Sequence, residues 1–140
     1  MKDFIDQPAF IIYKISIEEQ KSINNQLKSQ RLRLSHASLL KYIQQHPGCA
    51  PKEVAQQLKY QPASLTNMLK HLVELGMIKR EVNPNDPRRR HLYLLAKGTQ
   101  ALAAVNHAFA QMDKLIGPLQ PDSLQQLNCA LQQLTVANRH

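Results

Sequence analysis

The chain has 140 residues, of which 43% are hydrophobic, and it carries a net charge of +8 from 18 Lys and Arg against 10 Asp and Glu. This length and composition predict a single domain with its own core, and they exclude collagen-like and low-complexity chains. The longest apolar run near the start ends at Lys14 and is too short for a membrane span or a signal peptide, so we expect a cytoplasmic protein with no membrane partner.

The positive charge is concentrated in the middle of the chain. Residues 20–97 carry a net charge of +10, whereas residues 1–19 carry −2 and residues 98–140 are neutral. A basic region of this kind usually faces an anionic partner, most often nucleic acid. The distribution therefore predicts a central binding surface between terminal segments that have another role.

The first thirty residues allow two interpretations. Residues 10–17 are β-branched and partly alternating, as in a strand, but their apolar side chains also recur at helical spacing. We expect one long helix over residues 8–30, because residues 18–30 are rich in helix formers and contain no turn signal. A second helix should start at Ser35, a plausible N-cap, and end at 46–48, where His-Pro-Gly breaks the helix.

Two prolines mark the starts of two further helices. Pro51 and Pro62 each fit the first helical position, where the missing N–H costs nothing. Residues 60–61 leave room only for a tight turn between the two helices, and Gly76 should end the second helix. Its apolar side chains recur every three or four positions, which predicts one buried face: Leu65, Leu69, Leu72 and Leu75. The two helices form a helix-turn-helix.

A β-hairpin and two helices complete the chain. Residues 77–82 and 92–95 read as strands, and the turn-rich and basic residues 83–91 between them predict a wing with a long basic tip. The last two helices have apolar residues at the spacing of a coiled-coil-like seam. These seams are Leu102, Val105, Phe109, Met112 and Ile116 in one helix, and Leu124, Leu127, Leu131 and Leu134 in the other.

Ordered motifs between residues 39 and 98 resemble the MarR family of bacterial transcriptional regulators. They are Glu53-Val54-Ala55 followed by Leu58, Ser64-Leu65-Thr66, Leu72 with Gly76-Met77-Ile78 and Arg80, Asp86-Pro87-Arg88, and Leu94 with Gly98. The chain departs from the family pattern at Gln61, Ala63, Lys70 and Leu95. The resemblance implies a mainly α fold with a small β-hairpin wing. It also implies one domain over residues 1–140, with a winged helix-turn-helix lobe at 35–98 between dimerisation helices at 1–34 and 99–140.

The resemblance implies that the helix after Pro62 enters the major groove of DNA. Asn67 can pair with adenine, Thr66 can contact a base or a thymine methyl, and Ser64 and Lys70 suit phosphates. A solvated helix face without a partner is the alternative. The basic residues Arg31 and Arg33 fit a phosphate contact or a solvated stretch equally well.

The wing carries three consecutive arginines: Arg88, Arg89 and Arg90. Arginine suits a narrow minor groove, whose negative potential attracts a guanidinium. The resemblance implies that Asp86 orients Arg88. A charged hairpin tip without a partner is the alternative.

The resemblance also implies that the chain pairs with a second copy of itself as a homodimer. Both apolar seams would be buried against the two-fold mate, with Leu124, Leu127, Leu131 and Leu134 as the dimerisation residues. The operator would be a pseudo-palindrome with half-sites about 34–36 Å apart. In this family a small molecule, often an aromatic acid or phenol, binds between the dimer and DNA-binding lobes and relieves repression. We therefore expect a repressor with a small aromatic effector.

The sequence offers no sign of catalysis or of a cofactor. None of the six His residues pairs at i,i+4 or lies at a metal-ligand spacing from a Cys or an acid, so we expect no metal and no enzyme. Cys49 and Cys129 form no CxxC motif, lie outside the first helix that peroxide-sensing relatives use, and are interpreted as buried small residues. A winged-helix module for protein interaction and a non-specific nucleoid binder are the rival functions.

Overall fold

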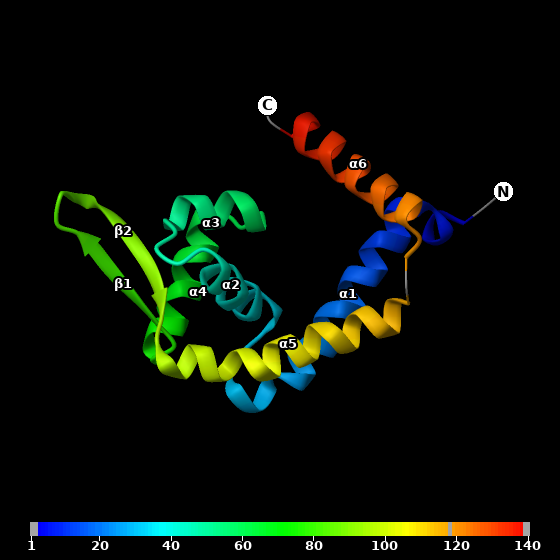
Figure 1. The fold of residues 1–140 in the computed structure, drawn as a ribbon. Coiled ribbons are helices and arrows are strands. Elements are labelled where there is room, and N and C mark those ends of the chain that lie inside the picture. Colours follow the sequence, from blue (N-terminus) through cyan, green and yellow to red (C-terminus); the bar gives the residue numbers. More distant parts are fainter. Residues whose placement is uncertain (1–2, 118, 139–140) are drawn as a thin grey trace.

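The computed structural model describes residues 3–117 and 119–138, together with their side chains except those of residues 83, 87–90 and 115. Figure 1 shows a lobe of short helices and a hairpin at one end of a long helix, with the last helix at the opposite side. The α-helices are α1 (Pro8–Gln26), α2 (Leu34–Gln45), α3 (Pro51–Leu58), α4 (Pro62–Glu74), α5 (Ala96–Ile116) and α6 (Pro121–Ala137). The strands are β1 (Ile78–Asn83) and β2 (Asp86–Leu94), and two 3-10 turns are η1 (Phe4–Asp6) and η2 (Lys28–Gln30). This confirms the expected mainly α fold with a hairpin wing.

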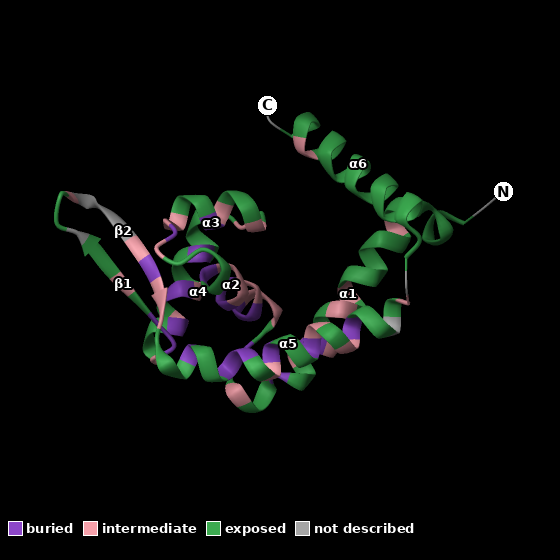
Figure 2. Ribbon diagram, in the orientation of Figure 1, coloured by how far each residue is buried: buried purple, intermediate pink, exposed green. Residues whose placement is uncertain are grey.

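The core lies where α2, α4, α5 and the base of the hairpin meet, as the purple segments of Figure 2 show. The apolar side chains that helical spacing placed on one face of α4 are buried or half-buried. Burial of each such large side chain contributes about 1.5–3 kcal/mol before the entropy of folding is counted. The core thereby fixes α4 with its polar face outward.

The N-terminal segment is the expected helix and not a strand, but α1 ends at Gln26 instead of near residue 30. Leu27 and Leu32 are both buried, and the chain must turn between them to bring both into the core. The turn uses η2 and then Arg31, whose φ of 61° is left-handed. This is why the helical pattern of residues 18–30 overestimates the length of the helix.

Ser35 does not cap α2, so that prediction is wrong. The helix begins at Leu34, and its first N–H groups find other acceptors. The Arg33 N–H donates to His36 Nδ1 at 3.0 Å, and the Leu34 N–H donates to Asn24 Oδ1 at 2.7 Å. Because Asn24 comes from α1, ten residues earlier in the chain, local sequence signals could not locate this cap.

Prolines and a glycine mark helix ends where the sequence predicted them. Pro51 and Pro62 each stand at a helix N-terminus, and Gly76 follows α4 with a φ of 72°. Gly98 matters for close packing, because a β-carbon there would collide with the carbonyl oxygen of Met77. Leu95 precedes α5 without a side-chain cap, as its departure from the family pattern suggested.

The wing differs from the expected long tip. β1 and β2 pair antiparallel from Ile78 opposite Leu94 to Val82 opposite Arg90, and β2 already begins at Asp86 after a register irregularity. The residues expected at the tip, 88–90, therefore lie in a strand, because ladder pairing extends further than the turn signals indicated. An isolated bridge between Cys49 and Leu92 joins the base of the wing to the loop before α3.

The two terminal seams behave differently. Leu102, Val105 and Met112 of α5 are buried within the chain itself, so the expectation that this seam waits for a partner is wrong for those residues. They pack where α5 contacts α1 and α2. In contrast α6 is almost wholly green in Figure 2, and Cys129 on it is exposed, contrary to its interpretation as a buried residue. None of the described helices is long and apolar enough to cross a membrane.

Candidate nucleic-acid interface

The outer face of α4 presents the four side chains predicted to contact DNA. Ser64, Thr66, Asn67 and Lys70 are all exposed, because the buried leucines hold the opposite side of the helix in the core. The Thr66 hydroxyl donates to the Pro62 carbonyl at 3.0 Å and keeps its lone pairs for a donor. Within the described part of the chain, the side chains of Asn67 and Lys70 make no hydrogen bond. The face is thus polar, ordered along one helix, and open.

A pair of histidines fixes the C-terminal half of α4. His71 and His36 lie with their ring centroids 4.4 Å apart, and His71 Nε2 donates to the Arg31 carbonyl oxygen at 2.8 Å. His36 is buried, and this burial, followed by the charges of His71 and Arg33, lowers its pKa to about 4. His36 is therefore neutral at physiological pH and can accept the Arg33 N–H through Nδ1. The pair ties α4 to the loop before α2.

A basic groove of about 670 Å³ lies beside the N-terminus of α4. Its walls come from α3, the first two turns of α4, and β1. The charged residues among its described lining are Lys52, Lys59 and Arg80, all of them basic. Arg80 Nε is buried and has no hydrogen-bond partner within the described residues. The positive charges of the three lining side chains make the groove suited to an anionic oxygen.

The sequence motifs include Arg80 but did not predict its place in the groove. A signal existed, since side chains alternate across a strand and Arg80 lies two residues after buried Ile78. That alternation puts Arg80 on the inward side, where an arginine is unusual. The groove itself could not be read from the sequence, because it joins residues of α3, α4 and β1.

The base of the wing is attached to the loop between α2 and α3. His91 Nδ1 lies 2.7 Å from the Gly48 carbonyl oxygen and donates to it, since a carbonyl only accepts. The backbone of Arg88, Arg89 and Arg90 runs directly before this anchor in β2. Their side chains lie outside those that the structure describes, so their DNA contacts and the orientation of Arg88 by Asp86 stay predictions.

The other charged and sulfur-containing candidates are placed as follows. Arg31 and Arg33 are exposed on the loop before α2, and both of their predicted alternatives stay open. Cys49 is buried, and this burial, with the nearby Glu53 charge, raises the pKa of its thiol to about 11, so it is an inert core residue. No group of three or more possible metal ligands occurs among the described residues.

An apolar stripe runs along α6. Leu124, Leu127, Leu131 and Leu134 are 51%, 42%, 52% and 62% exposed. Helical spacing puts all four on one side of α6. A stripe of this size on a single helix is uncommon on the surface of a monomer and is typical of a protein interface.

A helix with an open polar face, a preceding helix joined by a tight turn, and a hairpin anchored beside them define a winged helix-turn-helix protein. Residues 32–89 match the model of the MarR family. The chain is 26% identical over 131 residues to "HTH-type transcriptional regulator BilQ" of Clostridium symbiosum, and the match covers 91% of each protein. The chain is therefore similar to transcriptional regulators of the MarR family.

Further proteins are similar to this chain. A putative transcriptional regulatory protein for the hcr operon of Thauera aromatica is 30% identical over 76 residues, which cover 54% of this chain and 46% of that protein. The chain thus aligns with about half the length of this relative. S. aureus MepR, solved in complex with DNA, superposes with a TM-score of 0.80 at 21% identity, covering 94% of this chain and 98% of that one. PcaV of Streptomyces coelicolor, solved with its natural ligand, superposes with a TM-score of 0.80 at 17% identity. The match covers 98% of this chain and 97% of that one. These two likenesses concern the fold.

Proposed function

We propose that the chain is a sequence-specific DNA-binding regulator in which α4 reads the major groove. The observation that carries the proposal is the open polar face of α4 beside a groove whose described charged lining residues are all basic. Major-groove base edges carry a distinct pattern of donors and acceptors, which Asn67 and Thr66 can read. Ser64 and Lys70 on the same helix, and Arg80 in the groove, suit phosphate oxygens.

The regulator would act as a homodimer formed mainly through α6. The exposed leucine stripe of α6 supports a second copy as its partner, because a two-fold axis lets identical apolar stripes cover each other. Exposed apolar side chains at the start of the chain, including Ile12 and Tyr13, would extend that interface. The proposed division puts dimerisation in residues 1–34 and 99–140, and DNA binding in 35–98. Two lobes then meet half-sites about 34–36 Å apart.

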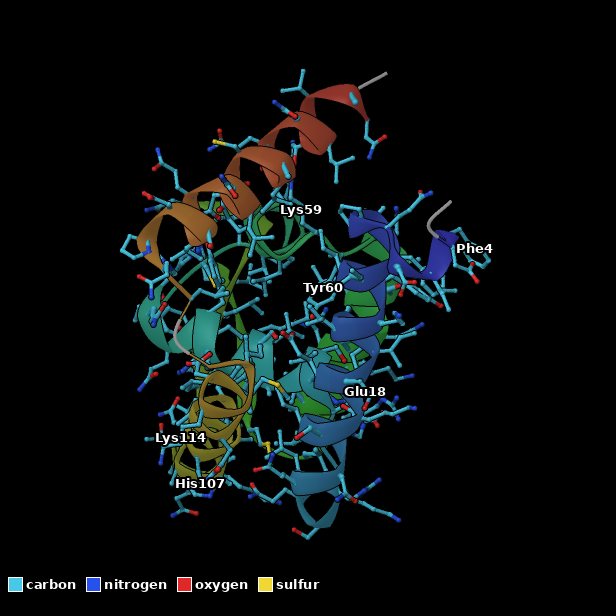
Figure 3. All side chains as sticks on the ribbon, turned by 90° about the vertical axis from the view of Figure 1, so that its right-hand side faces the viewer. Phe4, Glu18, Lys59, Tyr60, His107 and Lys114 are labelled. Atoms are coloured by element: carbon cyan, nitrogen blue, oxygen red, sulfur yellow. The ribbon has the colours of Figure 1, made fainter. Side chains whose placement is uncertain are left out.

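The proposed regulation is repression that a small aromatic acid relieves. A pocket of about 190 Å³ lies between α1 and the lobe and includes Asn24, Arg33 and Tyr60 in its lining. Figure 3 shows Tyr60 directed toward α1. Arg33 offers a guanidinium for a carboxylate, and Tyr60 offers an aromatic face. A ligand there would touch both the N-terminal helix and the lobe, and so would change their spacing. We further propose that the protein acts at DNA in the cytoplasm and that it has no catalytic role.

A gel shift with competing random duplex tests the proposal. A labelled duplex selected for binding should resist competition by random DNA by a factor of about 10³ or more at physiological salt. Equal competition by random DNA would instead indicate a non-specific nucleoid binder. Absence of binding at moderate salt would indicate a winged-helix module for protein interaction.

A further inference from the structure

One hydrogen bond joins the last helix to the helix-turn-helix. Lys59 Nζ donates to Thr135 Oγ1 at 3.0 Å, and the Thr135 hydroxyl in turn donates to the Leu131 carbonyl at 2.9 Å. Figure 3 shows Lys59 directly below α6. Thr135 is half-buried, whereas every other residue of α6 is exposed. This contact is therefore the place where α6 meets the reading half of its own chain.

Lys59 is also part of the basic groove. It follows the last residue of α3 in a left-handed conformation, with a φ of 63°, and stands at the turn that leads into α4. Its side chain lines the groove with Lys52 and Arg80. This left-handed residue ends α3, and the Tyr60 N–H that follows it donates to the Ala55 carbonyl oxygen at 3.0 Å.

The two acceptors available to Lys59 differ in strength. Thr135 offers a neutral hydroxyl oxygen, already engaged as a donor to Leu131. A phosphate in the groove would offer anionic oxygens, and hydrogen bonds between charged partners are roughly twice as strong as neutral ones. The groove is also favourable for an anion because α4 begins beside it without a side-chain cap, which leaves N–H groups of its first turn to attract negative charge.

We propose that Lys59 is a phosphate-contacting residue that α6 holds away from DNA through Thr135. Binding of DNA draws the ammonium group of Lys59 from Thr135 into the groove, and the cost of breaking this hydrogen bond lowers the affinity of the free protein for DNA. The inference rests on the proposed function, since it assigns a role within the same DNA interface. It makes α6, the proposed dimerisation helix, a direct modulator of DNA affinity.

The test compares Thr135→Val with Thr135→Ser. Valine keeps the shape of threonine but offers no acceptor, so this variant should bind a selected duplex about two- to tenfold more tightly than the wild type. Serine retains the hydroxyl and should bind like the wild type. Lys59→Met should bind more weakly, and its log–log salt slope should be flatter by about one for each phosphate that the lysine neutralises in the wild type.

A double variant makes the result specific to Lys59. If the lysine carries the effect, Thr135→Val should change nothing in a Lys59→Met background. Equal or weaker binding by Thr135→Val, or the same gain with and without Lys59, would overturn the inference. A wild-type protein that binds no duplex would overturn the proposed function itself, and so the two failures are distinguishable.

Discussion

His71 of α4 donates through Nε2 to the carbonyl oxygen of Arg31, 2.8 Å away, in the loop before α2. Its ring lies beside that of His36, which accepts the N–H of Arg33. Two backbone groups of one loop are thus bound to one histidine pair, and the pair is part of α2 and α4. The histidine pair thereby connects the helix proposed to read DNA to the loop before α2.

This arrangement predicts a loss of stability in mild acid. The folded chain keeps the pKa of His36 near 4, while the unfolded chain takes up the proton at the ordinary value near 6.5. The stabilisation is fully present above pH 6.5 and declines as the pH falls from 6.5 through 4, by about 2–3 kcal/mol in all. Denaturant unfolding at pH 7.5, 5.5 and 4.5 measures this decline.

The control is His36→Gln, whose amide oxygen can still accept the Arg33 N–H but whose side chain does not titrate. Its free energy of unfolding should vary less with pH than that of the wild type over this range. Identical pH profiles for the two proteins would show that His36 is not the titrating group.

Most of the fold could be predicted from the sequence, because local signals mark most of its elements. Pro51, Pro62 and Gly76 mark helix ends through backbone chemistry that acts at the residue itself. The errors arise where distant residues decide the outcome. Asn24 of α1 accepts the N–H that begins α2, and burial of Leu27 and Leu32 ends α1 early. No local pattern contains either contact.

The candidate site was predictable only in part. The polar face of α4 follows from helical spacing, and all four of its predicted residues are exposed. The place of Arg80 in the groove could not be predicted, because it depends on how β1 packs against α3 and α4. The two apolar seams were indistinguishable by spacing, yet Leu102 is buried within the chain and Leu131 is exposed, because α1 and α2 cover α5 only.

Two substitutions on α4 separate base contacts from phosphate contacts. Asn67→Ala should relax sequence preference at one position in each half-site, at about 1–3 kcal/mol for each bidentate contact. Lys70→Ala should weaken binding to all duplexes alike and flatten the salt slope by about one per contact. Binding isotherms on matched and singly altered duplexes at several salt concentrations measure both effects. If both variants lost only non-specific affinity, α4 would not be the reading helix.

Charges in the α6 stripe should break the proposed dimer. The wild type should sediment at about 32 kDa, twice its mass of 16.0 kDa. Leu127→Asp combined with Leu131→Asp would bury two charges without partners at a cost of several kcal/mol, and should give a monomer with weak affinity for palindromic DNA. Gln133→Asp, on the opposite side of α6, is the matched control and should remain dimeric. A wild-type monomer that binds a palindrome at full strength would refute the dimer.

The direction in which Asp86→Ala changes DNA affinity tests the role proposed for the wing. Arg88→Ala should reduce DNA affinity with little change in stability, because an exposed ion pair contributes only about 0–1 kcal/mol to folding. Asp86→Ala should also reduce affinity, though less, since it would remove the carboxylate that orients the arginine. Charge counting alone predicts the opposite, because an acid is removed near DNA. Tighter binding by Asp86→Ala at fixed salt would therefore exclude the orienting role.

The most direct test of the central claim is selection of bound duplexes from a random pool by the full-length protein, followed by sequencing. Sequence-specific reading by α4 in a homodimer predicts an enriched inverted repeat with half-sites about 34–36 Å apart, centre to centre. The same selection with Asn67→Ala should lose preference at one position in each half-site. A pool with no enriched sequence, or with a single half-site lacking a symmetric mate, would contradict the account.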